Sequence, residues 1–114
     1  AYAGARAAYF VVLADGEVVG GGGVAPLEGG PADVCELRKM YFRSGIRGQG
    51  LGQKLMDQCL VAARDAGYSR CYLETLTAME KARALYRRNG FTPLTAPLGA
   101  TGHFGCDSWF VKAL

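Results

Sequence analysis

Three glycines and an arginine fall within the six residues 47–52, a spacing that could bind phosphate. Glycines lack a Cβ atom, so the main chain can come close to a ligand. The first amides of a helix direct free N–H groups and the positive end of its dipole at an anion. This segment joins a strand-like run to a helical pattern. We therefore expect a phosphate site formed by Arg47, Gly48, Gln49, Gly50, Leu51 and Gly52.

The spacing differs from two common nucleotide motifs. The third glycine comes one residue too early for the dinucleotide pattern GxGxxG, and no Gly-Lys-Ser or Gly-Lys-Thr follows as in a P-loop. A glycine-rich surface loop that merely starts a helix is the simpler interpretation. The surrounding charge favours the anion, because residues 36–54 hold five basic residues and a single acid.

The composition is typical of a globular domain. The 114 residues are 50% hydrophobic and 20% charged, which excludes intrinsic disorder, and they are too few for two separate cores. We expect one domain over residues 1–114. The net charge of +3 is too small to indicate a nucleic-acid partner. The longest apolar run, residues 7–14, is far below the roughly 20 residues that cross a bilayer, so we expect no membrane partner.

The four cysteines are widely spaced and contain no CxxC pair. A domain with this apolar content needs no disulfide bridge. The first six residues lack the basic and apolar regions of an export signal. We therefore expect free thiols and a cytoplasmic location.

Local patterns predict a mixed sheet with two helices. Asp15-Gly16 separates two β-rich runs and favours a hairpin turn, and further runs rich in aromatic and β-branched residues complete the predicted strands at 8–14, 17–24, 34–42, 68–75 and 106–114. Apolar residues recur every three or four positions from Leu51 until Gly67, as in an amphipathic helix. Thr77 and Glu80 form a capping-box pattern for a second helix that ends at Asn89-Gly90. The order β-β-β-α-β-α-β predicts an α+β fold with one parallel crossover.

Two separated motifs resemble those of the GNAT superfamily of N-acetyltransferases. The acetyl-CoA motif of that family, Arg/Gln-x-x-Gly-x-Gly/Ala, is matched here by Arg47, Gly50 and Gly52. Residues 82–91, ARALYRRNGF, are similar to its A-x-x-L-Y-x-x-x-G-F signature. Both motifs stand in the family's order on the expected elements, and the resemblance covers about residues 8–114.

The resemblance implies acetyl-CoA as cosubstrate. In the family, the CoA diphosphate rests on the glycine loop, and the pantetheine arm runs between two diverging parallel strands and pairs with the main chain of the first. Here that strand would end in Met40, Tyr41 and Phe42. The thioester would lie between strands that end near Phe42 and Thr75, where an acceptor amine could attack it.

The resemblance also suggests which residues could take a proton from the acceptor amine and give one to the leaving thiolate. Glu36 and Glu74 are the candidate bases, and for both a solvated strand carboxylate is the alternative. Tyr86 matches the family tyrosine whose hydroxyl lies near the CoA sulfur and can protonate the departing thiolate. An aromatic side chain that packs in the core is its other interpretation.

One further polar segment precedes the last predicted strand. His103 and Asp107 could bind a polar acceptor or relay a proton, or they could be a loop histidine and a strand-start cap. A zinc site that combined His103 with cysteines 35, 71 and 106 has only one local ligand pair, so we expect no metal.

Two departures from the family pattern bear on function. Family members usually carry a strand and one or two helices ahead of the hairpin, so we expect either a part of a longer protein or a minimal form with an open acceptor site. Met79 stands where an asparagine often contacts the cofactor. We expect an N-acetyltransferase that acts on an amine of a small molecule or peptide, with a homodimer as an option. An inactive CoA-binding module is the main alternative, and a nucleotide-binding domain is a weaker one.

Overall fold

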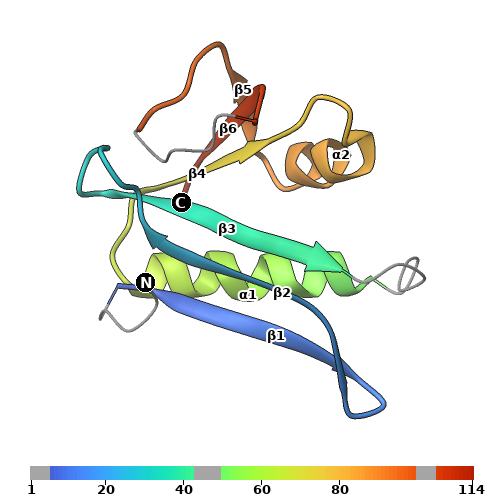
Figure 1. The fold of residues 1–114 in the computed structure, drawn as a ribbon. Coiled ribbons are helices and arrows are strands. Elements are labelled where there is room, and N and C mark those ends of the chain that lie inside the picture. The colour runs from blue at the N-terminus through green and yellow to red at the C-terminus, as the bar shows by residue number, and fades with distance from the viewer. Residues whose placement is uncertain (1–5, 43–49, 100–104) are drawn as a thin grey trace.

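A computed structural model describes residues 6–42, 50–99 and 105–114, which form one six-stranded sheet and two helices (Figure 1). The strands are β1 (Ala8–Ala14), β2 (Glu17–Pro26), β3 (Val34–Phe42), β4 (Arg70–Thr75), β5 (Thr92–Leu94) and β6 (Ser108–Ala113), and the helices are α1 (Leu51–Asp65) and α2 (Glu80–Arg88). Their order across the sheet is β1-β2-β3-β4-β6-β5. The expected mixed α+β architecture is confirmed.

The predicted hairpin joins β1 and β2. Asp15 and Gly16 both have positive φ angles, of 51° and 80°, which the tight turn requires. The glycine run of β2 pairs on its other side with β3, where the register shifts between Gly21 and Gly23. Gly21 lies opposite Tyr41 and Gly23 opposite Arg38, so β3 holds one more residue than β2 at this bulge.

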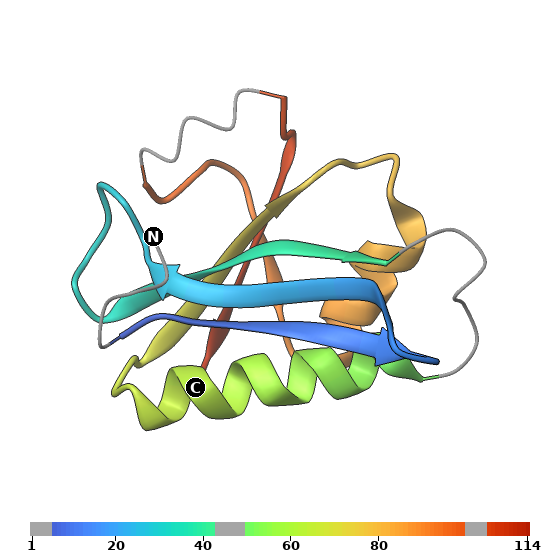
Figure 2. The same cartoon turned by 60° about the horizontal axis from the view of Figure 1, so that its bottom comes forward.

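Helix α1 covers one face of β1, β2 and β3 (Figure 2). The apolar side predicted from its three-and-four spacing is buried, and comprises Leu55, Met56, Cys59, Leu60 and Ala63. These side chains form the main core together with residues of the sheet and of α2. None of the helices in the described ranges is long and apolar enough to cross a membrane.

The parallel pair β3–β4 is short. Val34, Cys35 and Glu36 pair with Arg70, Cys71 and Tyr72, and no pairing follows, although both strands continue. Figure 1 shows the two strands diverging toward their carboxyl ends. Because their facing main-chain groups no longer pair beyond Glu36, this part of the sheet can accept another extended chain.

Several boundaries differ from those expected from the sequence: β2 extends to Pro26, β6 begins at Ser108, and α2 and β4 begin later than predicted. The capping-box prediction is wrong: α2 begins at Glu80, and its N-cap residue, Met79, makes no side-chain capping bond. The Thr77 amide instead donates a hydrogen bond to Asp107 Oδ1 at 2.7 Å. The strand predicted from residue 68 begins at Arg70, because the Tyr68 amide still donates to the helix carbonyl of Ala63. The short strand β5 was not predicted.

Candidate active site

The start of α1 provides main-chain donors for an anion. Its N-cap, Gly50, has φ 70° and ψ 10°, a left-handed conformation that favours glycine. Gly50 has no side chain that could cap this helix end, and the first turn of α1 carries no acid. A Cβ atom on Gly50 would meet nothing within 4 Å, so the space in front of this main chain is open. The amides of the first helical turn have no partner within the helix, which makes the end suited to phosphate.

Arg47, Gly48 and Gln49 of the predicted phosphate loop lie outside the described residues. Leu51 and Gly52 of the same loop form the first turn of α1. The preceding strand ends with Met40, which lies in the bulge, and with Tyr41 and Phe42 beyond it, and Tyr41 is exposed. The predicted pantetheine segment therefore lies on β3 beyond the point where its pairing with β4 ends.

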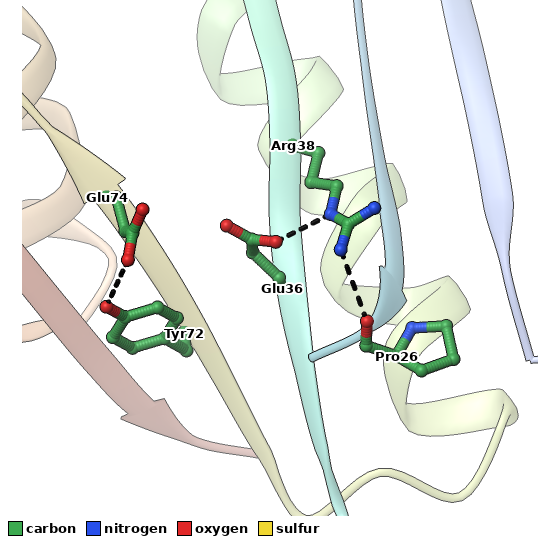
Figure 3. Close-up of polar contacts among 5 residues, drawn as sticks. All are labelled: Pro26, Glu36, Arg38, Tyr72 and Glu74. Atoms are coloured by element: carbon green, nitrogen blue, oxygen red, sulfur yellow. Dashed lines mark hydrogen bonds and ion pairs between the residues drawn. The ribbon is translucent and has the colours of Figure 1, made fainter. Parts of the chain in front are cut away.

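Glu36 is a buried carboxylate in the centre of the sheet. Only 1% of the residue is exposed, and Arg38 Nε donates to its Oε1 at 2.6 Å (Figure 3). The same guanidinium reaches the Pro26 carbonyl of β2 at 3.5 Å. Strand alternation places Glu36 and Arg38 on one face of β3, which is why the two side chains meet. The guanidinium compensates the charge of a carboxylate that water cannot reach.

Glu74 extends from β4 on the same side of the sheet. The Tyr72 hydroxyl donates to its Oε2 at 2.6 Å (Figure 3). Burial raises the pKa of Tyr72 well above its usual value, and the hydrogen bond to Glu74 raises it further. In Figure 3 the carboxylates of Glu36 and Glu74 face each other across the space between β3 and β4. The structure thus brings together the two candidate bases.

Tyr86 lies on α2 and belongs to the main core. Its ring contacts those of Phe91 and Phe110, each with a centroid separation of 6.0 Å. The residue is 8% exposed, and burial raises the pKa of its hydroxyl. The packing role considered for this side chain is therefore present, and the raised pKa keeps the hydroxyl protonated at neutral pH.

The loop before β6 joins the ends of two other elements. Asp107 accepts the hydrogen bond from the Thr77 amide, and its own amide donates to the Thr75 carbonyl at 3.2 Å. Burial raises the pKa of the neighbouring Cys106, and the negative charges of Glu74, Asp107 and Glu36 raise it further. Asp107 thus fixes the loop next to the two glutamates, whereas His103 lies outside the described residues.

Metal ligands are not grouped in the described ranges. No set of three or more His, Cys, Asp or Glu side chains there could hold a metal ion. Cys35, Cys59 and Cys71 are free and fully buried in the main core, and burial raises the pKa of Cys59 to about 12.

Sequence reasoning missed the importance of one residue at this site. Tyr72 was interpreted only as an aromatic residue of a strand, although it stands two positions before Glu74 and therefore on the same face. That spacing was the available signal. The parallel pairing of Glu36 with Tyr72, after which β3 and β4 diverge, could not be seen in local spacing.

Comparison with known proteins identifies the family. The model of the acetyltransferase (GNAT) family matches residues 2–91. The chain belongs to the GNAT family. Among GNAT proteins, it is 50% identical to the uncharacterized N-acetyltransferase YjgM of Escherichia coli (strain K12) over 107 residues. The match covers 94% of this chain and 64% of that relative, so the chain spans less than two thirds of its length.

Solved GNAT structures share the fold. An acetyltransferase of the family from Staphylococcus aureus superposes with a TM-score of 0.84 at 20% identity, over 95% of this chain and 68% of that one. The PaiA N-acetyltransferase of Thermoplasma acidophilum, in complex with coenzyme A, gives a TM-score of 0.77 at 18% identity, over 95% and 61% of the two chains. The resemblance drawn from the two sequence motifs is confirmed at the level of family and fold.

Proposed function

We propose that this chain forms the catalytic part of an N-acetyltransferase, which moves an acetyl group from acetyl-CoA to an amine. The observation that carries the proposal is the early end of β3–β4 pairing at Glu36 and Tyr72, next to two carboxylates. An extended pantetheine arm can pair with the main chain that this divergence frees. Membership of the GNAT family and the coenzyme A complex of the Thermoplasma relative support the same cosubstrate.

The diphosphate of CoA would lie on the first turn of α1. The open space at Gly50 and the absence of a side-chain cap there fit a ligand that bears phosphate. Gly52 lets the helix approach the ligand closely, and Arg47, Gly48 and Gln49 would extend the cradle. Met40, Tyr41 and Phe42 would present their main chain to the pantetheine arm.

Direct attack by the amine needs two proton transfers. An alkyl amine has an ordinary pKa near 10.4, so a base must take its proton before or during attack. Glu36 and Glu74, whose carboxylates face each other across the gap, are the candidates. As the C–N bond forms and the C–S bond breaks, the thiolate leaves, and Tyr86, the match to the family tyrosine, would donate a proton to it.

The acceptor is an amine of a small molecule or peptide, and Asp107 with His103 would stand at its entrance. A cytoplasmic location agrees with four free cysteines, three of them buried. A homodimer would offer one way to extend the acceptor wall. These features concern the whole protein, of which this chain can be a part.

A thiol-release assay tests the proposal. Acetyl-CoA is mixed with the chain and a panel of primary amines, namely spermidine, L-lysine, glucosamine and tyramine, and free CoA is measured with a thiol reagent. We expect release that depends on both the chain and one of the amines. Binding of acetyl-CoA without amine-dependent release would support the inactive CoA-binding module, and stabilisation by ATP but not by CoA would support the nucleotide-binding alternative.

A further inference from the structure

Two side-chain amides connect the start of α1 with the end of α2. Gln53 Nε2 donates a hydrogen bond to Asn89 Oδ1 at 2.7 Å, and Asn89 Nδ2 donates one to Gln53 Oε1 at 3.0 Å. The Gln53 amide group also donates to Asp57 Oδ1 at 2.8 Å, and the Asn89 amide group to the Leu85 carbonyl at 2.8 Å. Each NH2 group therefore uses both of its hydrogens, which fixes the orientation of the two side chains.

Each residue of this pair belongs to an element of the proposed acetyl-CoA site. Gln53 lies in the first turn of α1. The Lys54 amide donates to the Gly50 carbonyl at 3.2 Å and so begins the hydrogen bonds of the helix, which places the main-chain amide of Gln53 among those without a partner inside the helix. Asn89 is the C-cap of α2, and its main-chain amide donates to the Tyr86 carbonyl at 3.1 Å. The pair thus joins the proposed phosphate-binding turn to the part of α2 that carries Tyr86.

Helix α2 depends on few attachments. Its N-cap, Met79, makes no side-chain capping bond, and among its nine described residues Tyr86 alone is buried. Ala82 and Leu85 pack against the core in part, and the Tyr86 ring packs against two core phenylalanines. A helix this short is marginal in isolation. One buried ring fixes one point of α2, and the amide pair is a second attachment that opposes rotation of the helix about that point.

We propose that Gln53 and Asn89 are positioning residues that set the place of the Tyr86 hydroxyl relative to the sulfur of bound CoA. This inference rests on the proposed acetyltransferase function and goes beyond it, because neither residue belongs to the predicted site. The turn of α1 that binds the diphosphate is the turn to which the pair attaches α2. The hydroxyl that protonates the leaving thiolate is therefore held at a fixed distance from the bound cosubstrate, and a shift of about 1 Å in such a group lowers the rate strongly.

Gln53→Met tests the pair, with Gln58→Met as the matched control. Methionine has nearly the length and helix propensity of glutamine but cannot form the amide hydrogen bonds. Gln58 is an exposed glutamine of the same helix. We expect Gln53→Met to lower kcat about fivefold and to change the Kd for acetyl-CoA less than about twofold, because the main-chain donors of the first turn remain. Gln58→Met should keep the wild-type kcat and Kd.

An exchange of side-chain lengths separates positioning from direct contact between Gln53 and the cosubstrate. Gln53→Asn shortens one amide by a methylene group, and Asn89→Gln lengthens the other by the same amount. We expect Gln53→Asn to lose activity as Gln53→Met does, and the double variant to recover at least about half of the wild-type kcat, because the pair can form again. If Gln53→Met does not fold by circular dichroism, this exchange gives the same comparison.

A double-mutant cycle with Tyr86→Phe tests what the pair positions. If Gln53 and Asn89 act through the Tyr86 hydroxyl, Gln53→Met should lower kcat no further once that hydroxyl is absent. A fivefold loss that persists in the Tyr86→Phe background would show that the pair acts on another group, and it would overturn the inference.

Four further results would also overturn it. They are wild-type kcat in folded Gln53→Met, equal losses in Gln53→Met and Gln58→Met, a loss confined to the Kd for acetyl-CoA, or a length-exchanged variant no more active than Gln53→Asn. Each of these leaves the acetyltransferase function standing, because the wild-type chain still turns over. A wild-type chain that releases no CoA with any amine of the panel refutes the proposed function, and this inference with it.

Discussion

The hydroxyl of Tyr86 stands at the end of a ring that the core already holds in place. Tyr86→Phe keeps the contacts with Phe91 and Phe110 and removes only the proton donor. We expect kcat to fall about tenfold or more, while the Kd for acetyl-CoA changes less than twofold, because the role proposed for the hydroxyl is to protonate the leaving thiolate and not to bind the cosubstrate. Steady-state kinetics and calorimetric titration measure the two quantities. An equal loss in both would assign Tyr86 to binding or packing alone.

At the residue scale, the sequence predicted those site residues that belong to a recognisable motif. The glycine loop and Tyr86 were predicted in this way, and Glu36, on the strand that leads to the loop, and Glu74, at the end of the neighbouring strand, were predicted as carboxylates that could take a proton. Their partners were harder to predict. Which of the two glutamates meets Arg38 and which meets Tyr72 depends on how β3 and β4 separate, and that is a property of the sheet.

Hydrogen bonds to Asp33 connect the start of β3 with the start of β4. Its carbonyl accepts hydrogen bonds from the Ser69 and Arg70 amides at 2.9 and 3.3 Å, and its carboxylate accepts one from the Ser69 hydroxyl. That hydroxyl bond, first among several causes, holds the pKa of Asp33 below its ordinary value of 3.8. The lowered pKa means that the ionised group stabilises the folded chain above pH 3.8 and that this contribution is lost as the pH falls through the folded-state pKa.

We therefore expect the difference in stability between the wild-type chain and Asp33→Asn to depend on pH. At pH 6 the wild-type chain should be more stable than the variant, and the difference should shrink between about pH 4 and pH 2. Thermal unfolding at several pH values measures it. Ser69→Ala should reproduce the result, because it removes the main donor to the same carboxylate. A difference that stays constant down to the lowest pH would contradict this account of the junction.

At the element scale, the three-and-four apolar spacing predicted α1, because this spacing reflects burial directly. The Asp15-Gly16 turn predicted the hairpin, and runs rich in aromatic and β-branched residues predicted the long strands. The start of α2 was misjudged because Thr77 donates its amide to Asp107, thirty residues away, and so does not cap the helix. Strand β5 has only three residues, one of them Pro93, and depends on antiparallel pairing with β6. Both features are set by partners distant in the sequence.

The distribution of thiols tests the packing of the whole molecule. Cys35, Cys59 and Cys71 have no exposed surface, whereas Cys106 is partly exposed. We expect iodoacetamide to modify Cys106 first in the folded chain and all four cysteines after unfolding, because burial denies access and suppresses the thiolate. Peptide mass spectrometry after timed labelling gives the order. Modification of the three core cysteines at the rate of Cys106 in the folded chain would contradict the arrangement of the core.

At the scale of the molecule, two short motifs sufficed to predict the family, since each combines a rare residue pattern with a fixed place in the fold. They did not define the acceptor. In the proposed function, the acceptor meets the loop of Asp107, whose position follows from tertiary contacts, namely the hydrogen bonds that join Asp107 to Thr75 and Thr77. Membership of the family therefore predicts the acetyl-CoA side of the site better than the side that binds the acceptor amine.

In the proposed function, main-chain amides at the start of α1 bind the diphosphate of acetyl-CoA. Titration calorimetry of Gly50→Trp, with Gly67→Trp as the control, tests this binding. Both glycines flank α1, have positive φ angles of 70° and 89°, and have open space where a Cβ would be, so the backbone strain is matched. We predict that Gly50→Trp loses about a hundredfold in acetyl-CoA affinity, or about 2.7 kcal/mol, while Gly67→Trp binds as the wild type does. Unchanged affinity in folded Gly50→Trp would contradict the claim.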